Sequence, residues 1–410
     1  MPLRMLKRFK DVREVSRTLA SPLSEADAQI QSMEDASPAK WHLAHTSWFF
    51  ETLILIPYYK GYEPFNQQYQ YLFNSYYNGI GKQFCRASRG MLSRPSMTEV
   101  MHYRQHVDNH MCELLESSPD DQCIWLTNLG THHEQQHQEL LLTDVKHAFS
   151  QNPLYPRYRE LAVGNDTESQ LTWINVDEGI FEIGTDLRDF AFDNESPKHK
   201  VYLHNYALSN RLVTNAEYLK FIEDGGYQTP QLWLSDGWAQ VQNNNQDLPI
   251  YWQQNDSGEY QQFTLGGLRP VMMNQPVTHL NYYEADAYAR WCGARLPSEF
   301  EWEVAAANLS IDGPFLTLDR LHPYATQGTG LVQMFGQCWQ WTSSAYSAYP
   351  GYTPFSGAVG EYNGKFMSGQ QVLRGGSCVT PESSYRLTYR NFFYPHQAWQ
   401  FTGIRLAKTQ

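Results

Sequence analysis

The six cysteines of this 410-residue chain include no Cys-x-x-Cys pair. Their scattered positions fit neither a zinc ribbon nor a dense disulfide scaffold, and a reducing compartment is the simplest expectation. No apolar run is long enough to cross a membrane, and residues 1–13 lack the apolar core of a secretory signal. We therefore expect a soluble, cytoplasmic protein with no membrane partner.

Positive charge is also scarce, because the formal net charge is -12. Proteins that bind nucleic acid usually carry a basic surface, so we expect no nucleic-acid partner. The sequence has no internal repeat and no low-complexity tract. Its length, with 41% hydrophobic and 18% charged residues, predicts a globular protein with two domains.

The first part of the chain shows the spacing of amphipathic helices. Apolar residues recur at helical intervals over residues 23–33, 41–55, 98–116 and 123–149. A loop-rich passage, residues 58–94, interrupts them. Four such helices predict a helical bundle over residues 1–150.

The second part has a different pattern. Residues 151–170 are polar and predict a linker. Residues 171–410 combine many turn signals with short strands and helices, and they predict an α+β domain rich in irregular structure. The expected strands and helices are residues 172–176, 179–183, 200–208, 215–223 and 283–291.

The motif His-Glu-Gln-Gln-His at residues 133–137 carries the strongest chemical signal. On a helix, His133 and His137 lie about 40° apart and one turn apart, so both imidazoles can reach one metal ion. His132 points about 140° away from His137, and His147 lies roughly 21 Å further along the helix than His133. The pair therefore needs a further ligand from elsewhere in the chain.

The third ligand cannot be chosen from spacing. His42 and His45 lie three residues apart in a strongly apolar helix, and either can face the bundle axis. A rival set, His102, His106 and His110, points about 100° away from the apolar stripe of its helix and is read as a solvated flank. Three neutral imidazoles suit zinc, copper or ferrous iron, and the metal stays open at this point.

Three other features have both a structural and a functional interpretation. The His-Glu-x-x-His spacing also occurs in zinc proteases, where the glutamate, here Glu134, would act as the base. Arg86 and Arg89 are either solvated surface arginines or a clamp for a substrate carboxylate. Tyr76 and Tyr77 serve either packing or catalysis.

Two sets of motifs resemble known families. The motif Ser-Pro-x-x-Trp-His-Leu-Ala-His at residues 37–45, with residues 133–137, resembles the DinB-type four-helix bundle. The second part resembles the formylglycine-generating-enzyme fold, which is C-type-lectin-like. Its marks are residues 179–184, 193–199, 213–218, 295–303 and 374–377. This order of domains resembles the ergothioneine-pathway iron(II) sulfoxide synthases.

The resemblance implies a reaction. His45, His133 and His137 would be the ligands of Fe(II), with O2 as co-substrate. The enzyme would join the sulfur of cysteine, or of gamma-glutamylcysteine, to C2 of the imidazole of hercynine (trimethylhistidine) and oxidise it to a sulfoxide. The second domain lacks the cysteine pair of formylglycine-generating enzymes, so we expect it to bind substrate.

The resemblance also assigns site residues. Tyr76 and Tyr77 match the catalytic tyrosine pair of the branch that uses free cysteine. By their i, i+3 spacing, Arg86 and Arg89 match the arginines that bind the substrate carboxylate in the mycobacterial branch, which uses gamma-glutamylcysteine. Gln136 and the turn at 391–393 match residues that hold hercynine. These turn residues are Asn391, Phe392 and Phe393, where the mycobacterial branch has Asn-Trp-Asp. The two phenylalanines would meet the trimethylammonium group by cation–π contact.

Four alternatives remain beside this interpretation. A selenoneine synthase or an ovothiol-type sulfoxide synthase would share the domain plan, although the methyltransferase domain usual in ovothiol synthases is missing. A non-catalytic scaffold protein would keep both folds without turnover. A zinc-dependent thiol transferase would use the DinB-like domain without oxygen.

Overall fold

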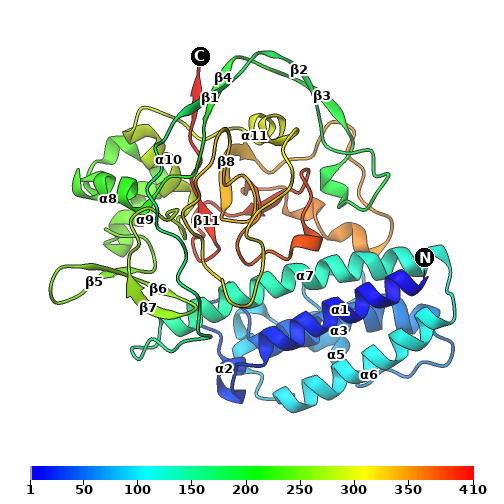
Figure 1. Ribbon diagram of the computed structural model, residues 1–410. Helices are drawn as coiled ribbons and strands as arrows, with labels where there is room; N and C mark the ends of the chain where they lie inside the picture. The colour runs from blue at the N-terminus through cyan, green and yellow to red at the C-terminus, as the bar shows by residue number, and fades with distance from the viewer. Residues whose placement is uncertain (1) are drawn as a thin grey trace. The chain divides into compact units, whose positions relative to one another are not determined.

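The computed structural model describes residues 2–410 and divides them into two compact units. The first unit contains the residues up to Tyr158 together with Ser356–Tyr362, and the second contains Arg159–Phe355 and Asn363–Gln410. Four long helices lie side by side in the first unit (Figure 1). They are α1 (Pro2–Ala20), α3 (Ala39–Phe50), α6 (Met97–Glu116) and α7 (Asp121–Ser150). Both α1 and α3 pack against α6 and α7, which confirms the predicted four-helix bundle.

The first helix of the bundle is not the predicted one. Within residues 23–33 only α2 (Glu25–Gln29) is helical; it begins at a capping box made by Ser24 and Asp27, and it ends where Ile30 turns to extended backbone. The bundle helix is instead α1. Its buried face recurs every three or four residues and contains Leu6, Phe9, Val12, Arg13, Ser16 and Leu19. Basic residues between these positions lower the hydropathy of the segment, which concealed the pattern.

Side-chain caps fix where α6 and α7 begin. The helix expected over residues 98–116 begins one residue earlier, at Met97, because Ser96 caps it in a capping box with Glu99. Asp120 accepts a hydrogen bond from the N–H of Cys123 and caps α7. Between α3 and α6 the chain forms short helical pieces. They are a π-helical turn (Glu51–Leu55), α4 (Ile56–Tyr58), α5 (Tyr69–Leu72) and a 3-10 turn (Arg86–Met91).

A buried ionic cluster joins the four helices of the bundle. The carboxylate of Glu134 on α7 accepts hydrogen bonds from Arg13 on α1 (2.9 Å), Arg104 on α6 (2.8 Å) and Ser16 (2.6 Å). Arg13 also donates to Ser47 on α3 at 2.8 Å. Charged groups out of water need such complete pairing, so the cluster holds the helices in one register.

Short strands and helices make up the second unit. The strands form four small sheets, in the orders β1-β4-β12, β10-β9-β8-β11, β2-β3 and β5-β6-β7. Their bounds are β1 (Trp173–Val176), β2 (Gly179–Ile183), β3 (His199–Leu203), β4 (Tyr206–Ser209), β5 (Trp252–Gln254), β6 (Tyr260–Thr264), β7 (Gly267–Pro270), β8 (Trp339–Ala345), β9 (Gln371–Arg374), β10 (Asn391–Phe393), β11 (Thr402–Gly403) and β12 (Ala407–Thr409). The helices are α8 (Asn215–Glu223), α9 (Ser235–Asn244), α10 (Tyr282–Trp291) and α11 (Glu299–Ala306).

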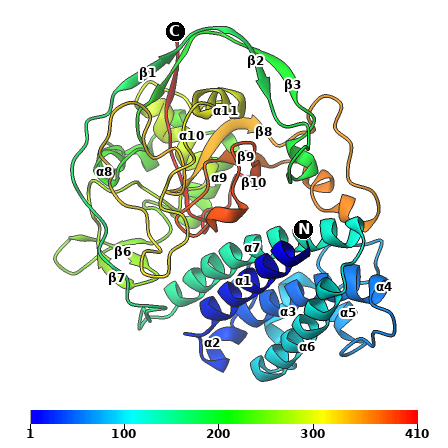
Figure 2. The ribbon, with the colours of Figure 1, turned by 45° about the vertical axis from the view of Figure 1, so that its right-hand side comes forward.

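The structure confirms most of the elements predicted here and corrects one. The segment 200–208, predicted as one strand, is divided between β3 and β4. These two strands belong to different sheets, since β3 pairs with β2 and β4 pairs with β1 and β12. Two helices, α9 and α11, were not predicted. Figure 2 shows β8, β9 and β10 next to one another in the largest sheet.

The glutamate-rich motif at residues 295–303 is an ion-pair network. Three of its glutamates form ion pairs with arginines: Glu301 binds Arg295 and Glu303 binds Arg374. Glu299 binds Arg390 and also lies 3.6 Å from Arg374. The pair of Glu299 with Arg390 is bidentate, with nitrogen–oxygen distances of 2.8 and 2.9 Å. The motif that marks the family resemblance therefore holds α11 against the largest sheet.

Two further expectations can be compared with the structure. None of the six cysteines, all of which lie within residues 2–410, forms a disulfide bond, and three of them are buried. Over residues 2–410, none of the helices combines the length and the apolar character that crossing a membrane requires.

The ionic cluster gives a first prediction. In Glu134→Ala, two guanidinium groups stay buried without their carboxylate, and we expect the free energy of unfolding to fall by about 3–5 kcal/mol. Chemical denaturation measures this change. Glu116→Ala, at an exposed position on α6, is the control and should change stability by less than about 0.5 kcal/mol. Wild-type stability in Glu134→Ala would contradict the structural role.

Candidate active site

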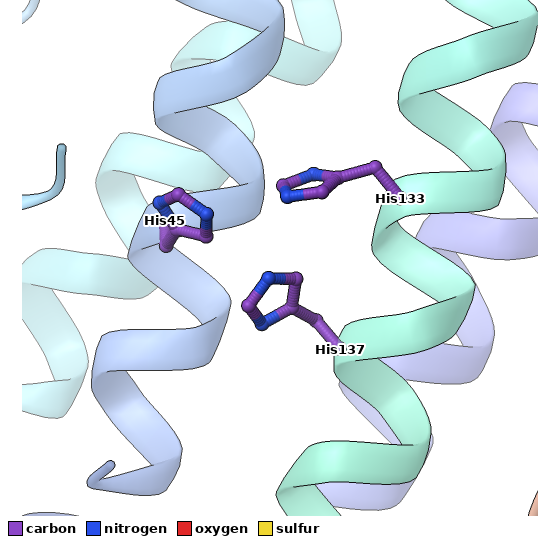
Figure 3. Close-up of side chains that lie close together, drawn as sticks. All are labelled: His45, His133 and His137. Atoms are coloured by element: carbon purple, nitrogen blue, oxygen red, sulfur yellow. The ribbon is translucent and has the colours of Figure 1, made fainter. Parts of the chain in front are cut away.

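Three buried histidines from two helices meet inside the bundle. His45 comes from α3, and His133 and His137 come from α7, one turn apart (Figure 3). Their potential ligand atoms all lie within 4.8 Å of one another. The centroid of the His45 ring lies 5.0 Å from the centroid of the His133 ring and 4.7 Å from that of the His137 ring. Such a set of nitrogen atoms could hold one metal ion.

The hydrogen bonds of the rings leave nitrogen atoms available for an ion. Nδ1 of His45 lies 2.5 Å from the carbonyl oxygen of Phe73, so this nitrogen carries the proton and Nε2 has a lone pair. Nε2 of His45 and both nitrogens of His133 are buried without a hydrogen-bond partner. Unpaired buried nitrogens are costly, and a metal ion at their centre satisfies them.

Electrostatics keep the three rings in the neutral form that binds metal. Burial lowers the pKa of His133 to about 3. Burial, together with the neighbouring imidazoles, holds the pKa values of His45 and His137 well below the usual value. Metal ions bind the unprotonated ring, so protons compete weakly for this site at neutral pH.

His42 supports the cluster without joining it. Its Nε2 lies 3.0 Å from a carboxylate oxygen of Asp144, and its Nδ1 lies 2.9 Å from Nδ1 of His137. The carboxylate accepts a hydrogen bond from the protonated Nε2, so Nδ1 of His42 is unprotonated and accepts a hydrogen bond from the N–H at Nδ1 of His137. Nε2 of His137 then faces the cluster as a lone pair. The choice between His42 and His45, which spacing left open, is thus resolved geometrically in favour of His45 as the member of the cluster.

The other histidines lie elsewhere. His132 contacts Arg8, and His147 contacts Ser32, so both stand apart from the cluster as the helical geometry predicted. His106 and His110 pack against the ring of Tyr62. Among the described residues, His45, His133 and His137 alone form a group of three or more potential ligands close enough to share a metal ion.

Glu134 is not arranged as the base of a zinc protease. Burial alone would raise the pKa of its carboxyl group, but the guanidinium groups of Arg13 and Arg104 and the hydroxyl of Ser16 lower it to about 2. Both oxygens already accept hydrogen bonds inside the bundle. A general base must reach a water molecule or a substrate proton, and this carboxylate is committed to the ionic cluster.

Aromatic rings connect the histidines to the predicted tyrosines. Trp48 stacks on His45 at 5.6 Å and lies 5.4 Å from the ring of Tyr77. Tyr76 and Tyr77 are adjacent, with centroids 4.9 Å apart. Burial raises the pKa of Tyr76, and its neighbour Tyr77 raises it further. Both phenols therefore stay protonated at neutral pH and can donate hydrogen bonds.

The two predicted arginines have different surroundings. Arg89 is buried and lies over the ring of Trp41 at 3.4 Å, and Trp41 in turn stacks on His45 at 4.6 Å. Its guanidinium donates to the hydroxyls of Ser37 and Ser75. Burial and the charge of Arg86 lower the pKa of Arg89 to about 9. Arg86 is exposed and donates to the carbonyl of Asp35.

The remaining predicted residues divide between the units. Gln136 is half-buried on α7, one position before His137. Asn391, Phe392 and Phe393 form β10 in the second unit and are half-buried. The ring of Phe392 stacks on Tyr346 with centroids 4.0 Å apart. The first unit thus brings together the three histidines, the tyrosine pair and Arg89. The segment 391–393, predicted as a turn, is a strand of the other unit and pairs with β9.

Several residues of the site were not predicted. Asp144 and the supporting position of His42 depend on side-chain contacts that no spacing rule specifies. Tyr362 also lies at the cluster, with its ring 5.7 Å from His133. It is more than two hundred positions away in the chain, and no motif in its neighbourhood signals a role. The i, i+7 spacing of His137 and Asp144 on one face of α7 was the available signal for that carboxylate.

Comparison with known families agrees with this division into two parts. Residues 8–141 match the DinB superfamily. Residues 159–313 and 317–410 match the Sulfatase-modifying factor enzyme 1-like domain. The expected succession of a helical DinB-type domain and an α+β domain of the formylglycine-generating-enzyme type is confirmed.

Individual relatives narrow the class. A hercynine oxygenase of Mycolicibacterium thermoresistibile is 30% identical, over 93% of this chain and 90% of the relative. One of Mycolicibacterium smegmatis is 32% identical, over 78% of this chain and 80% of the relative. The ergothioneine biosynthesis protein 1 of Schizosaccharomyces pombe is 28% identical, over 61% of this chain and 32% of the relative. The chain therefore belongs to the hercynine oxygenase family of enzymes.

The contact between His42 and His137 gives a second prediction. In His42→Ala the ring of His137 loses the partner that fixes its orientation, and we expect the affinity for Fe(II) to fall about 10–100-fold. Anaerobic titration of the apo-protein measures the affinity. His102→Ala, an exposed position on α6, is the matched control and should leave it unchanged. Equal affinities in the two variants would show that the hydrogen bond between His42 and His137 does not contribute to the affinity for Fe(II).

Proposed function

We propose that this enzyme is an iron(II)- and O2-dependent sulfoxide synthase that joins the sulfur of cysteine to C2 of the hercynine imidazole in ergothioneine biosynthesis. One observation carries the proposal: three neutral, buried histidines with unpaired nitrogens lie beside a pair of protonated tyrosines. Membership of the hercynine oxygenase family supports hercynine as the acceptor. The similarity to the ergothioneine biosynthesis protein supports the pathway. A cytoplasmic location fits these small-molecule substrates.

The donor set of the site fits ferrous iron. His45, His133 and His137 would hold the ion through neutral imidazoles, which suit Fe(II), copper and zinc alike. Bound Fe(II) would supply open positions for the thiolate and for O2 and the redox chemistry that oxidises sulfur. The aromatic shell made by Trp41, Trp48 and Phe49 packs directly on the histidine rings and excludes water from them.

Arg89 is the residue that we assign to the carboxylate of the thiol substrate. Its guanidinium is buried and donates to two hydroxyl groups, and no carboxylate among residues 2–410 forms an ion pair with it. A planar guanidinium matches a carboxylate by two parallel hydrogen bonds. Arg86 is exposed and would act from the rim. A single buried cation suits the one carboxylate of cysteine, which favours cysteine over gamma-glutamylcysteine.

Tyr76 and Tyr77 are assigned as catalytic residues. Both keep their protons at neutral pH, so either phenol can donate a hydrogen bond or a proton to oxygen that derives from the co-substrate O2. Gln136 would bind hercynine from α7. For strand β10, we propose that Asn391 donates a hydrogen bond to hercynine while Phe392 and Phe393 face its trimethylammonium group.

Four rival functions differ from this one in their substrates, metal or need for oxygen. A selenoneine synthase would take a selenosugar in place of the thiol, and an ovothiol-type synthase would attack C5 of histidine. A zinc thiol transferase would work without oxygen. A scaffold protein would need no metal ion, whereas the unpaired buried nitrogens of the histidine cluster favour a protein that binds one.

The proposed reaction gives a third prediction. With Fe(II), O2, hercynine and cysteine, mass spectrometry should show the hercynine–cysteine sulfoxide, and one O2 should be consumed for each product. Cysteine should give a higher kcat/KM than gamma-glutamylcysteine. The zinc-loaded protein and an anaerobic reaction are the controls and should give no sulfoxide. Product formed without oxygen would overturn the proposal in favour of thiol transfer.

The tyrosine assignment gives a fourth prediction. In Tyr76→Phe and Tyr77→Phe, one hydroxyl group is lost and the rings stay, so we expect folding and Fe(II) binding to be preserved. Dioxygenation of cysteine to cysteine sulfinic acid is the reaction that competes with sulfoxide formation. We expect the ratio of sulfoxide to cysteine sulfinic acid to fall by about 10–100-fold in at least one variant, as for the loss of a general acid. Tyr394→Phe changes an exposed tyrosine and is the control. An unchanged ratio in both variants would reject the assignment.

A further inference from the structure

Seven residues from the second half of the sequence belong to the helical unit. Ser356–Tyr362 cluster with the residues up to Tyr158, whereas Phe355 before them and Asn363 after them belong to the second unit. The segment forms a short 3-10 turn, Ala358–Glu361, and Val359 within it is 6% exposed. We refer to Ser356–Tyr362 as the return segment.

Glu361 of the return segment binds the turn that follows the tyrosine pair. The N–H of Asn78 donates to Oε2 of Glu361 at 3.0 Å, and the N–H of Gly79 donates to Oε1 at 2.8 Å. Both of these turn residues are exposed, so water would otherwise compete for their N–H groups. A carboxylate that accepts two neighbouring N–H groups makes charge-assisted bonds in one fixed orientation.

The same turn is held from its inner side by Asn74. Its side-chain oxygen accepts the N–H of Tyr77 at 3.2 Å, and its side-chain amide donates to the carbonyls of Tyr77 and Gly81. Asn74 is buried and fixes the start of the turn, while Glu361 fixes its end. The backbone of Tyr77 therefore lies between two side-chain anchors.

Tyr362 reaches the site itself. Its hydroxyl lies within reach of the Tyr76 hydroxyl, and burial, together with Tyr77 and Tyr362, raises the pKa of Tyr76. The ring of Tyr362 lies 5.7 Å from the ring of Tyr76 and 5.7 Å from that of His133. Three phenol rings thus lie in a row, with Tyr76 in the middle and Tyr362 beside one of the histidines.

We propose that Glu361 and Tyr362 are positioning residues for the tyrosine pair. Glu361 holds the backbone of the turn after Tyr77, and the hydroxyl of Tyr362 sets the direction of the Tyr76 hydroxyl. This inference rests on the proposed function, because Tyr76 and Tyr77 are assigned there as catalytic residues. If Glu361 had no positioning role, its substitution would leave the products of the enzyme unchanged.

The test uses the full-length protein and two variants, each with a matched control. Glu361→Gln keeps the size of the side chain but removes its charge, and Tyr362→Phe removes one hydroxyl group. Their controls are Glu382→Gln and Tyr394→Phe, which alter exposed residues of the second unit. Hydrogen exchange of residues 74–82 is measured in the metal-free protein, and the products and Fe(II) stoichiometry are measured in the loaded enzyme.

The proposal predicts a separate result for each variant. In Glu361→Gln, the amides of Asn78 and Gly79 should exchange about tenfold faster, because a charge-assisted bond is lost. In both variants the ratio of sulfoxide to cysteine sulfinic acid should fall at least about fivefold. The kcat for sulfoxide formation should fall with it, while the KM for cysteine and the amount of bound Fe(II) stay unchanged. The controls should match the wild type.

Two outcomes would overturn the proposal. Unchanged exchange in Glu361→Gln would show that the carboxylate does not hold the turn, whatever reaction the enzyme performs. An unchanged product ratio in Tyr362→Phe, in an enzyme whose wild type forms the sulfoxide, would show that its hydroxyl does not direct Tyr76. If the wild type forms no sulfoxide at all, the proposed function fails, and the exchange experiment still decides whether Glu361 anchors the turn.

Discussion

The ion pairs of Glu134 are the constraint on which the site depends. This carboxylate lies on α7 next to His133 and binds arginines from α1 and α6, so it fixes both the rotation of α7 and its height in the bundle. A rotation of one residue would turn the two histidines of α7 about 100° away from His45. The bundle thus uses a charged group in its interior to specify one register, and the imidazoles meet as a result.

The same principle operates around the histidines on a smaller scale. Each ring that has a hydrogen bond on one nitrogen presents the other nitrogen to the centre of the cluster: Phe73 fixes His45, and His42 fixes His137. His133 has no such partner and is held by packing against Phe49, whose ring is 4.7 Å away. Burial then keeps all three rings neutral, which is the state that a metal ion requires.

Sequence patterns were sufficient for much of the fold and for part of the site. The helical period of residues 123–149 and the spacing of His133 and His137 predicted α7 and its two inward-facing imidazoles. The first bundle helix escaped prediction because arginines and lysines alternate with its apolar residues, and one of these cations, Arg13, is buried by the ionic cluster. Hydropathy treats such a residue as exposed. The choice of His45 over His42 and the role of Asp144 depend on contacts across helices, and helical spacing does not determine these.

The return segment has a consequence for how such a protein can be divided or recombined. A gene fragment that stopped at Tyr158 would encode all four long helices and the three histidines but would omit Glu361 and Tyr362. The helical unit is complete only when the chain has passed through most of the second unit and come back. Exchange of the second half between relatives therefore replaces part of the helical unit as well.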